Sequence, residues 1–142
     1  PSWPQNDTMS QPEALQGPEA GPLGVHVFTG DDRIRQAARS LPAARYLVTY
    51  SDTPPDAIDE VRKSKPAVAV LELRVGDYGG FGLAKDLHAL PSMGHLPLVM
   101  LCERPHDRWL CHQAGAQQVI VKPLSDPMAL LLALDAALAP SL

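Results

Sequence analysis

The segment from Ala67 to Leu73 reads AVAVLEL and restricts the possible folds more than any other part of the chain. Every residue in it except Glu72 is apolar, so the run does not alternate between apolar and polar positions. A strand with one face in water alternates, whereas a strand covered on both faces is apolar throughout. We therefore predict a central strand of a parallel sheet that has helices on both of its faces.

Strand-like runs on either side of this segment alternate with helical patterns. Further strands are predicted at VHVF (25–28), RYLVTY (45–50), HLPLVMLC (95–102) and QQVIV (117–121). Helices are predicted at 31–41, 51–66, 79–90, 104–116 and 125–138. Five strands that alternate with five helices favour an α/β fold with right-handed crossovers.

Residues 1–23 form a lead with a different composition, rich in Pro, Gln, Glu, Ser and Gly and without helical or strand periodicity. Such a segment is expected to be disordered. Met9 opens a plausible native start, so we interpret residues 1–8 as a foreign addition. The folded domain is predicted to span residues 24–142, which is long enough for one core built from Ala, Val, Leu and Ile.

Composition and charge exclude several classes of function. The net charge is −4 and the Lys and Arg residues are dispersed along the chain, which argues against direct nucleic-acid binding. No run approaches the roughly 20 apolar residues that a membrane span needs. The two cysteines suit a reducing compartment. We expect a cytoplasmic protein.

In parallel α/β sheets, the loops after the carboxyl ends of the strands carry the chemistry. The positions at that edge are Thr29, Gly30 and Asp31 after the first strand, Glu72 at the third, Cys102 and Glu103 at the fourth, and Lys122 and Pro123 at the fifth.

The stretch from Gly24 to Leu138 resembles the receiver domain of bacterial two-component response regulators. PAVAVLELRVGDYGGFGLAKDL resembles the third strand, phosphoacceptor loop and third helix of that family, with Gly80 at the position of a family glycine. GHLPLVMLC resembles its fourth strand, and AGAQQVIVKPL its fifth strand with the Lys–Pro pair. The resemblance implies a flavodoxin-like (βα)5 doubly wound fold, whose five parallel strands have the order 2-1-3-4-5.

The same resemblance implies that most of the reactive side chains are missing. Glu72 stands at the phosphoacceptor Asp, Thr29 and Gly30 at the two acidic Mg²⁺-binding positions, Cys102 at the hydroxyl residue, Glu103 at the small residue after it, and Val119 at the aromatic switch position. Lys122, Pro123 and Gly80 match the family. Asp31 and Asp32 follow one and two residues later, where we interpret them as a helix N-cap and a first-turn carboxylate.

Two interpretations of Glu72 remain open from the sequence. Glu72 either projects toward Lys122 and forms a fixed ion pair that mimics the charge of a phosphorylated Asp, or it is a tolerated remnant of a lost site. A conventional phospho-accepting receiver that uses Glu72 or a nearby Asp such as Asp77 is one alternative function. A small-anion or metabolite sensor that uses the vacated pocket near Lys122 is another.

Other constellations favour structural roles. Cys102, His106, Cys111 and His112 have loose metal-ligand spacing, but they are split between a strand end and a helix, where neighbouring side chains diverge. We predict no metal site, with Cys111 in the core and His112 at the surface. His26 alternates with valines in the first strand and is expected to be packed, with one ring nitrogen satisfied.

The remaining expectation is an interaction surface formed by the fourth helix (104–114), the fifth strand (117–121) and the fifth helix (126–138). Its predicted contact residues are Arg108, Trp109, His112, Leu131 and Leu134. Trp109 suits an interface anchor, although a place in the core is equally compatible with the sequence. The predicted function is a phosphorylation-independent pseudo-receiver without enzyme activity or cofactor. It would act on a protein partner or an attached output domain, and we expect a homodimer.

Overall fold

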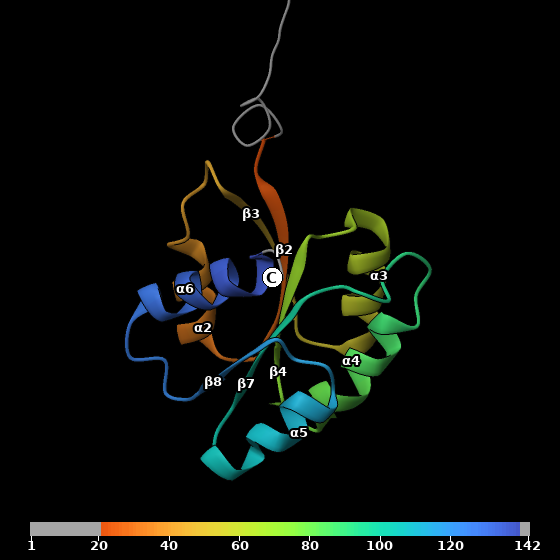
Figure 1. Ribbon diagram of the computed structural model, residues 1–142, viewed down its shortest axis with the longest axis vertical. Coiled ribbons are helices and arrows are strands. Elements are labelled where there is room, and N and C mark those ends of the chain that lie inside the picture. Colours follow the sequence, from red (N-terminus) through yellow and green to blue (C-terminus); the bar gives the residue numbers. More distant parts are fainter. Residues whose placement is uncertain (1–20, 140–142) are drawn as a thin grey trace, which may run out of the picture.

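The computed structural model describes residues 21–139, and these form one layered α/β unit around a five-stranded sheet (Figure 1). The strands are β2 (Leu23–Phe28), β3 (Tyr46–Ser51), β4 (Val68–Glu72), β7 (Leu98–Cys102) and β8 (Gln118–Val121). All neighbouring pairs are parallel, in the order β3-β2-β4-β7-β8. Counted among these five strands, the order is 2-1-3-4-5, which confirms the predicted fold class.

Helices cover both faces of the sheet (Figure 1). On one face, α2 (Asp32–Arg39) and α6 (Pro127–Leu138) enclose one apolar core with the valines of β2 and β4. On the other face, α3 (Pro54–Ser64), α4 (Gly80–His88) and α5 (Arg108–Gln113) enclose a second core that includes Phe28, Leu71 and Met100. Helices α2 and α3 bury apolar residues at helical spacing, Ile34, Ala37 and Ala38 in α2 and Ala57 and Val61 in α3.

The central strand β4 explains why the sheet has two cores. All five of its residues are buried, with Val68 and Val70 in one core and Ala69 and Leu71 in the other. Successive side chains of a strand point to opposite faces, so a strand without polar positions requires cover on both. The prediction from the apolar run is confirmed.

Two segments differ from their prediction. The helix expected over 104–116 is a 3-10 turn (Pro105–Asp107) followed by the short α5 (Arg108–Gln113). The loop between β4 and α4 contains a hairpin that the sequence did not indicate, β5 (Arg74–Val75) paired antiparallel with β6 (Tyr78–Gly79). Gly76 turns the hairpin with φ of +58°.

The lead that we expect over residues 1–23 lies almost wholly outside the described residues. Residues 1–8, which we interpret as a foreign addition, lie wholly outside them. Strand β2 begins at Leu23, one residue before the predicted domain start. Within residues 21–139, no helix combines the length and the apolar character that a membrane crossing requires.

Candidate functional site

The candidate site lies at the carboxyl ends of β2, β4, β7 and β8, where the sequence placed it. Gly80 opens α4 directly beneath the end of β4, and its backbone N–H donates to the Leu73 carbonyl at 2.8 Å. A Cβ atom on Gly80 would lie 2.1 Å from the Glu72 carbonyl oxygen. Only glycine fits there, so the glycine at this position fixes how α4 follows the acceptor strand.

Glu72 is 4% exposed, and both of its carboxylate oxygens are occupied. Oε1 accepts hydrogen bonds from the Thr29 hydroxyl and from the Gly30 backbone N–H, the latter at 3.2 Å. Oε2 lies 2.5 Å from Lys122 Nζ, across β7 from β4. The ion pair between Glu72 and Lys122, which was one of the two open interpretations, is present.

Asp31 joins the pair as a second carboxylate. Its side chain caps α2 by accepting from the Arg33 N–H, as expected, and it also lies 2.9 Å from Lys122 Nζ. The hydrogen bond from Lys122 lowers the pKa of Asp31 against an opposing effect of burial. Burial tends to lower the pKa of Lys122, but its hydrogen bonds to Glu72 and Asp31 outweigh this and raise it. Lys122 is therefore held as a cation between two anions.

Thr29 organises the loop above this pair. It is fully buried, its hydroxyl accepts from the Asp31 N–H at 2.9 Å, and the same hydroxyl donates to Glu72. The Arg35 guanidinium donates to the Thr29 carbonyl at 2.9 Å. The residue at the first of the two expected acidic positions thus serves as a neutral donor to Glu72.

Val75 closes the site from the side of the β5–β6 hairpin. It is 7% exposed, and a Cβ atom on Gly30 would lie 3.1 Å from Val75 Cγ1. Any side chain at position 30 would have to displace that methyl group. This contact could not be inferred from the sequence, because it depends on the hairpin.

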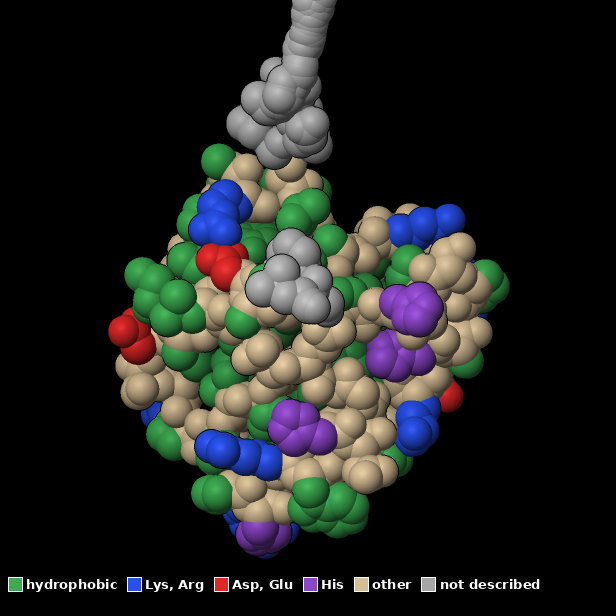
Figure 2. Space-filling view, in the orientation of Figure 1, with side chains coloured by type: hydrophobic (Ala, Val, Ile, Leu, Met, Phe, Trp, Pro, Cys, Tyr) green, Lys and Arg blue, Asp and Glu red, His purple; other side chains and the backbone are tan. Residues whose placement is uncertain are grey.

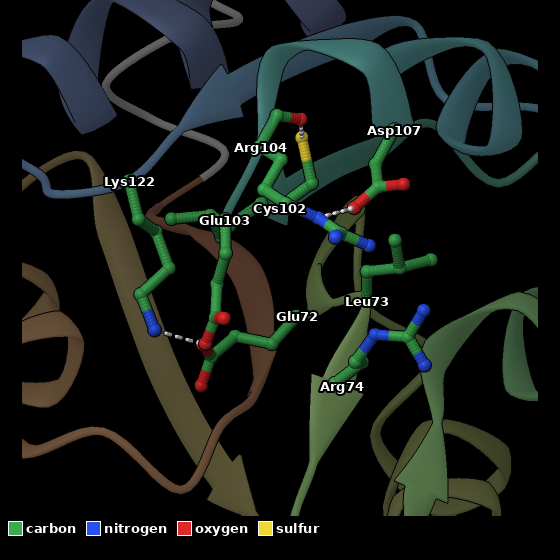
Figure 3. Close-up of a pocket in the computed structure, with 9 residues that line it drawn as sticks. Glu72, Leu73, Arg74, Cys102, Glu103, Arg104, Asp107 and Lys122 are labelled. Carbon is green, nitrogen blue, oxygen red and sulfur yellow. Dashed lines mark hydrogen bonds and ion pairs between the residues drawn. The ribbon is translucent and has the colours of Figure 1, made fainter.

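A cavity of about 160 Å³ opens beside Glu72 (Figure 3). Its lining includes Cys102, Glu103, Arg74, Arg104 and Asp107. In Figure 3, Lys122 lies next to the Glu72 carboxylate, whereas Arg104 points toward Asp107 on the other side of the cavity. Arg104 Nε is 3.4 Å from the buried Asp107 carboxylate. Arg74 and Asp107 are lining residues that the sequence interpretation missed, since neither stands at a family position.

The residues present do not fit Mg²⁺, the ion that a receiver-like site implies. Mg²⁺ requires near-octahedral oxygen ligands and usually keeps several waters. Here both carboxylates point at one ammonium group, and a threonine and a glycine stand where carboxylates would be needed. Within residues 21–139 there is no group of three or more His, Cys, Asp and Glu side chains that could hold a metal.

Cys111 is buried and His112 is exposed, as predicted. Cys102 is also free and buried, and His106 is exposed. Burial and the neighbouring Cys102 thiol raise the pKa of the Cys111 thiol to about 12. A thiol that stays protonated is a poor nucleophile and a poor metal ligand, so Cys111 contributes packing.

His26 is buried, but both of its ring nitrogens have partners, where one was expected. Nδ1 lies 2.8 Å from the Thr49 hydroxyl and Nε2 lies 2.7 Å from the Ser51 hydroxyl. Burial lowers the pKa of His26 to about 4. The ring is a neutral link between β2 and β3.

The predicted contact surface needs one correction. Leu134 is fully buried, and Leu131 is half-buried against the core, so Leu134 is not available for contact. The exposed apolar residues of α6 are Met128 and Leu132, at 52% and 61%. Residues 130, 133, 134 and 137 follow the buried stripe, and Met128 and Leu132 lie on the opposite side. Figure 2 shows hydrophobic side chains at the surface in the region of α6.

Trp109 is 61% exposed on α5, so it has no place in the core, whereas its role as an interface anchor stays a prediction. Arg108 and His112 are exposed on the same helix. Val119, at the switch position of β8, is half-buried against the core beneath α5.

No protein-family model matches the chain, and no curated protein matches it. Solved structures do. CheY4, the chemotaxis response regulator of Vibrio cholerae, is 23% identical, with a TM-score of 0.73 over 82% of this chain and 98% of that one. A CheY-like receiver domain protein from Methanospirillum hungatei is 18% identical, with a TM-score of 0.71 over 82% of this chain and 94% of that one. A receiver domain protein from Clostridium thermocellum is 14% identical, with a TM-score of 0.69 over 82% and 94%.

These likenesses establish the class of fold: the described residues have the CheY-like, flavodoxin-like receiver architecture. At these identities they do not carry function to this chain, because one fold hosts many activities. Function has to be inferred from the side chains at the carboxyl edge of the sheet.

Proposed function

We propose that the protein is a phosphorylation-independent pseudo-receiver that acts as a protein-interaction or dimerisation module in bacterial signal transduction, in the cytoplasm and without enzyme activity. The observation that carries the proposal is the occupation of the Glu72 carboxylate by Thr29, Gly30 and Lys122. Phosphoryl transfer needs a free attacking oxygen in line with the donor and a cation on the transferring oxygens. Neither requirement is met, because both Glu72 oxygens are engaged by groups of the chain and the Lys122 ammonium is paired with Glu72 and Asp31.

The geometry also supports this proposal over a conventional phospho-accepting receiver. A metal-binding carboxylate at position 30 is missing, and Val75 occupies the adjacent space. Glu72 is one methylene longer than Asp, and that methylene brings its carboxylate to Lys122. Asp77 is exposed in the turn of the β5–β6 hairpin. It is distant from Lys122 in the sequence and lies in a more exposed environment than the Lys122 ammonium.

The anion-sensor alternative depended on Lys122 as the recruiting cation. Lys122 is engaged by two carboxylates, at 2.5 Å from Glu72 and 2.9 Å from Asp31. An incoming anion would have to displace one of them. The geometry of the site therefore does not support the anion-sensor alternative.

The interaction surface that we propose combines Trp109 on α5 with Met128 and Leu132 on α6. Half or more of each side chain is exposed. Helices α5 and α6 cover opposite faces of the sheet and both pack against β8, so the proposed surface spans the β8 edge of the sheet. Large apolar side chains that remain in water are typical of docking surfaces. The partner is a second copy of this chain, another protein or an attached output domain.

The chemical part of the proposal is tested with acetyl phosphate, or with beryllofluoride, in the presence of Mg²⁺. We expect no phosphoryl adduct by intact mass and no change in Trp fluorescence. Glu72→Asp is the matched variant, and it should stay silent as well because Thr29 and Gly30 are unchanged. A Mg²⁺-dependent adduct that disappears in Glu72→Ala would overturn the proposal.

The interaction part is tested by sedimentation velocity over a range of protein concentrations. We expect self-association that is weakened by Leu132→Asp and kept in Lys85→Gln, a surface change on α4. A monomer at all concentrations would remove the homodimer and leave a heterologous partner to be sought with the same variants.

A further inference from the structure

The amino-terminal end of the sheet, opposite the candidate site, carries a second surface with features of a binding groove. A hollow of about 370 Å³ lies between β2, β3 and the end of α3. Gly24 and Leu47 are paired in the register of β2 and β3, and both line the hollow. Gly24 has no side chain, and Pro66 packs closely against it, since a Cβ atom at position 24 would lie 3.3 Å from Pro66 Cα.

Leu47 is 64% exposed, more than any other large hydrophobic residue of the described chain. Leu23, on the neighbouring strand, is 46% exposed and also lines the hollow. Leu23 pairs with Tyr46 in the strand register, so its side chain projects from the α2 and α6 face of the sheet, whereas Leu47 projects from the α3 face. Leu47 is therefore the large apolar side chain that the fold leaves exposed beside the hollow.

The adjoining strand β3 is an edge of the sheet, and among the described strands only β2 pairs with it. Natural edge strands are usually protected by charged residues, Pro, bulges or short length. The sequence of β3, YLVTYS, has six residues with no charge, no Pro and no Gly. The other edge, β8, is shorter at four residues. Strand β3 therefore offers an unprotected row of backbone donors and acceptors beside the hollow.

The rim of the hollow is basic. Lys65 lines it, and it also lines a neighbouring hollow of about 200 Å³ together with Arg62. Lys63 is exposed on the same helix end, and the only ion pair formed there is the long contact of 3.7 Å between Arg62 and Asp59. Figure 2 shows Lys and Arg side chains at the upper right, over this end of α3.

Cations at a helix C-terminus also interact favourably with the helix dipole. The dipole does not explain why Lys65 occupies the C-cap position of α3. Lys65 adopts the left-handed conformation with φ of +47°, where glycine is favoured. The chain thus keeps a long cationic side chain at a position that is conformationally unfavourable for it. That side chain borders both hollows.

From these features we propose that the β3 edge is a docking site for an extended acidic peptide segment of a partner protein. The peptide would add a strand to the free edge of β3, pack one apolar side chain against Leu47, and direct its carboxylates toward Lys65 and Arg62. Strand addition derives affinity from main-chain hydrogen bonds and specificity from alternate side chains. This site is independent of the function proposed for the Glu72 edge.

The test uses a fluorescein-labelled peptide of alternating glutamate and leucine, with a lysine–leucine peptide of the same length as its charge control. We expect saturable binding of the acidic peptide by anisotropy, and weaker binding at high salt. Leu47→Asp should weaken binding by at least about tenfold, and Lys65→Gln by about threefold, the range of one exposed ionic contact. Because both side chains are exposed, neither change should prevent folding.

Two matched variants on the other surface serve as controls. Leu132→Asp and Arg108→Gln make the same kinds of change on α6 and α5, and we expect neither to alter peptide affinity. The proposal is overturned by no saturable binding, by equal binding of the lysine peptide, or by a greater loss in Leu132→Asp than in Leu47→Asp. A dimer that forms without peptide and is lost in Leu47→Asp would assign the edge to a second copy and overturn the peptide assignment.

Discussion

Removing the charges of Glu72 and Lys122, singly and together, measures how strongly the fold depends on the ion pair at the carboxyl edge. Lys122→Met would leave a carboxylate that is 4% exposed without its cation. Loss of one partner of a buried pair costs about 3–5 kcal/mol. Glu72→Gln keeps the shape and an acceptor oxygen, and Lys122 would retain Asp31 at 2.9 Å. We expect a cost of about 1–3 kcal/mol, the range for a hydrogen bond to a charged group.

The double variant Glu72→Gln/Lys122→Met leaves no uncompensated charge at position 72. Asp31, which is partly exposed, loses its contact with Lys122 in the single and the double Lys122→Met variants alike, so that cost cancels in the cycle. The double variant should therefore cost less than the sum of the single changes, with a coupling free energy of about 2 kcal/mol. The assay is urea denaturation at low salt, with the free energy of unfolding obtained from the midpoint and the slope. Additive costs, with a coupling below about 0.5 kcal/mol, would refute the claim that the pair is an integral part of the fold.

The matched control for this cycle is the pair of Asp59 and Arg62 on α3. Their charged atoms lie 3.7 Å apart, and their side chains are 73% and 62% exposed. Exposed pairs of this kind contribute about 0–1 kcal/mol. A coupling there as large as that at Glu72 would show that the cycle reports general electrostatics and not the buried site.

Three further predictions concern stability and the site. Because burial lowers the pKa of His26 to about 4, the unfolded chain binds a proton that the folded chain does not between about pH 6.5 and 4. The free energy of unfolding should therefore fall by about 2 kcal/mol from pH 7 to pH 5, and a His26→Gln variant measured in parallel should lack this part of the slope. Gly80→Ala should cost about 3 kcal/mol because of the contact with the Glu72 carbonyl, whereas Gly82→Ala, which has open space in the same helix, should stabilise by up to about 1 kcal/mol. The lowered pKa of Asp31 implies stability that is present above its unfolded value and is lost as the pH falls through the folded one, so Asp31→Asn should reduce acid sensitivity in urea titrations.

The fold was predictable because its decisive features are local. Strand β4 has no polar position before its last residue, and helices α2 and α3 carry apolar stripes after start signals such as Asp31 and the prolines at 54 and 55. The β5–β6 hairpin was not predictable, since each of its strands has two residues and no periodicity can be detected in so short a segment.

At the site, the sequence identified the participating positions but not all of their contacts. The pairing of Glu72 with Lys122 follows from strand ends that meet at one edge. Asp31 was interpreted only as a helix cap because capping is a local pattern, whereas its ion pair with Lys122 joins residues 91 positions apart. The placement of Leu134 at the surface was wrong because α6 is apolar almost all round, so its periodicity does not distinguish one face from another.

The arrangement around Glu72 has a consequence for how such a domain could signal. A switch needs two states that bind a ligand or a phosphoryl group differently. Here Lys122, Thr29 and the Gly30 N–H belong to the same chain as Glu72, so the Glu72 carboxylate has its partners without a kinase or an added cation. Its negative charge is compensated from within the chain, and we therefore propose that this edge has one state. Under the function proposed above, regulation must then enter through binding, either at Trp109 and Leu132 or at the unprotected edge of β3.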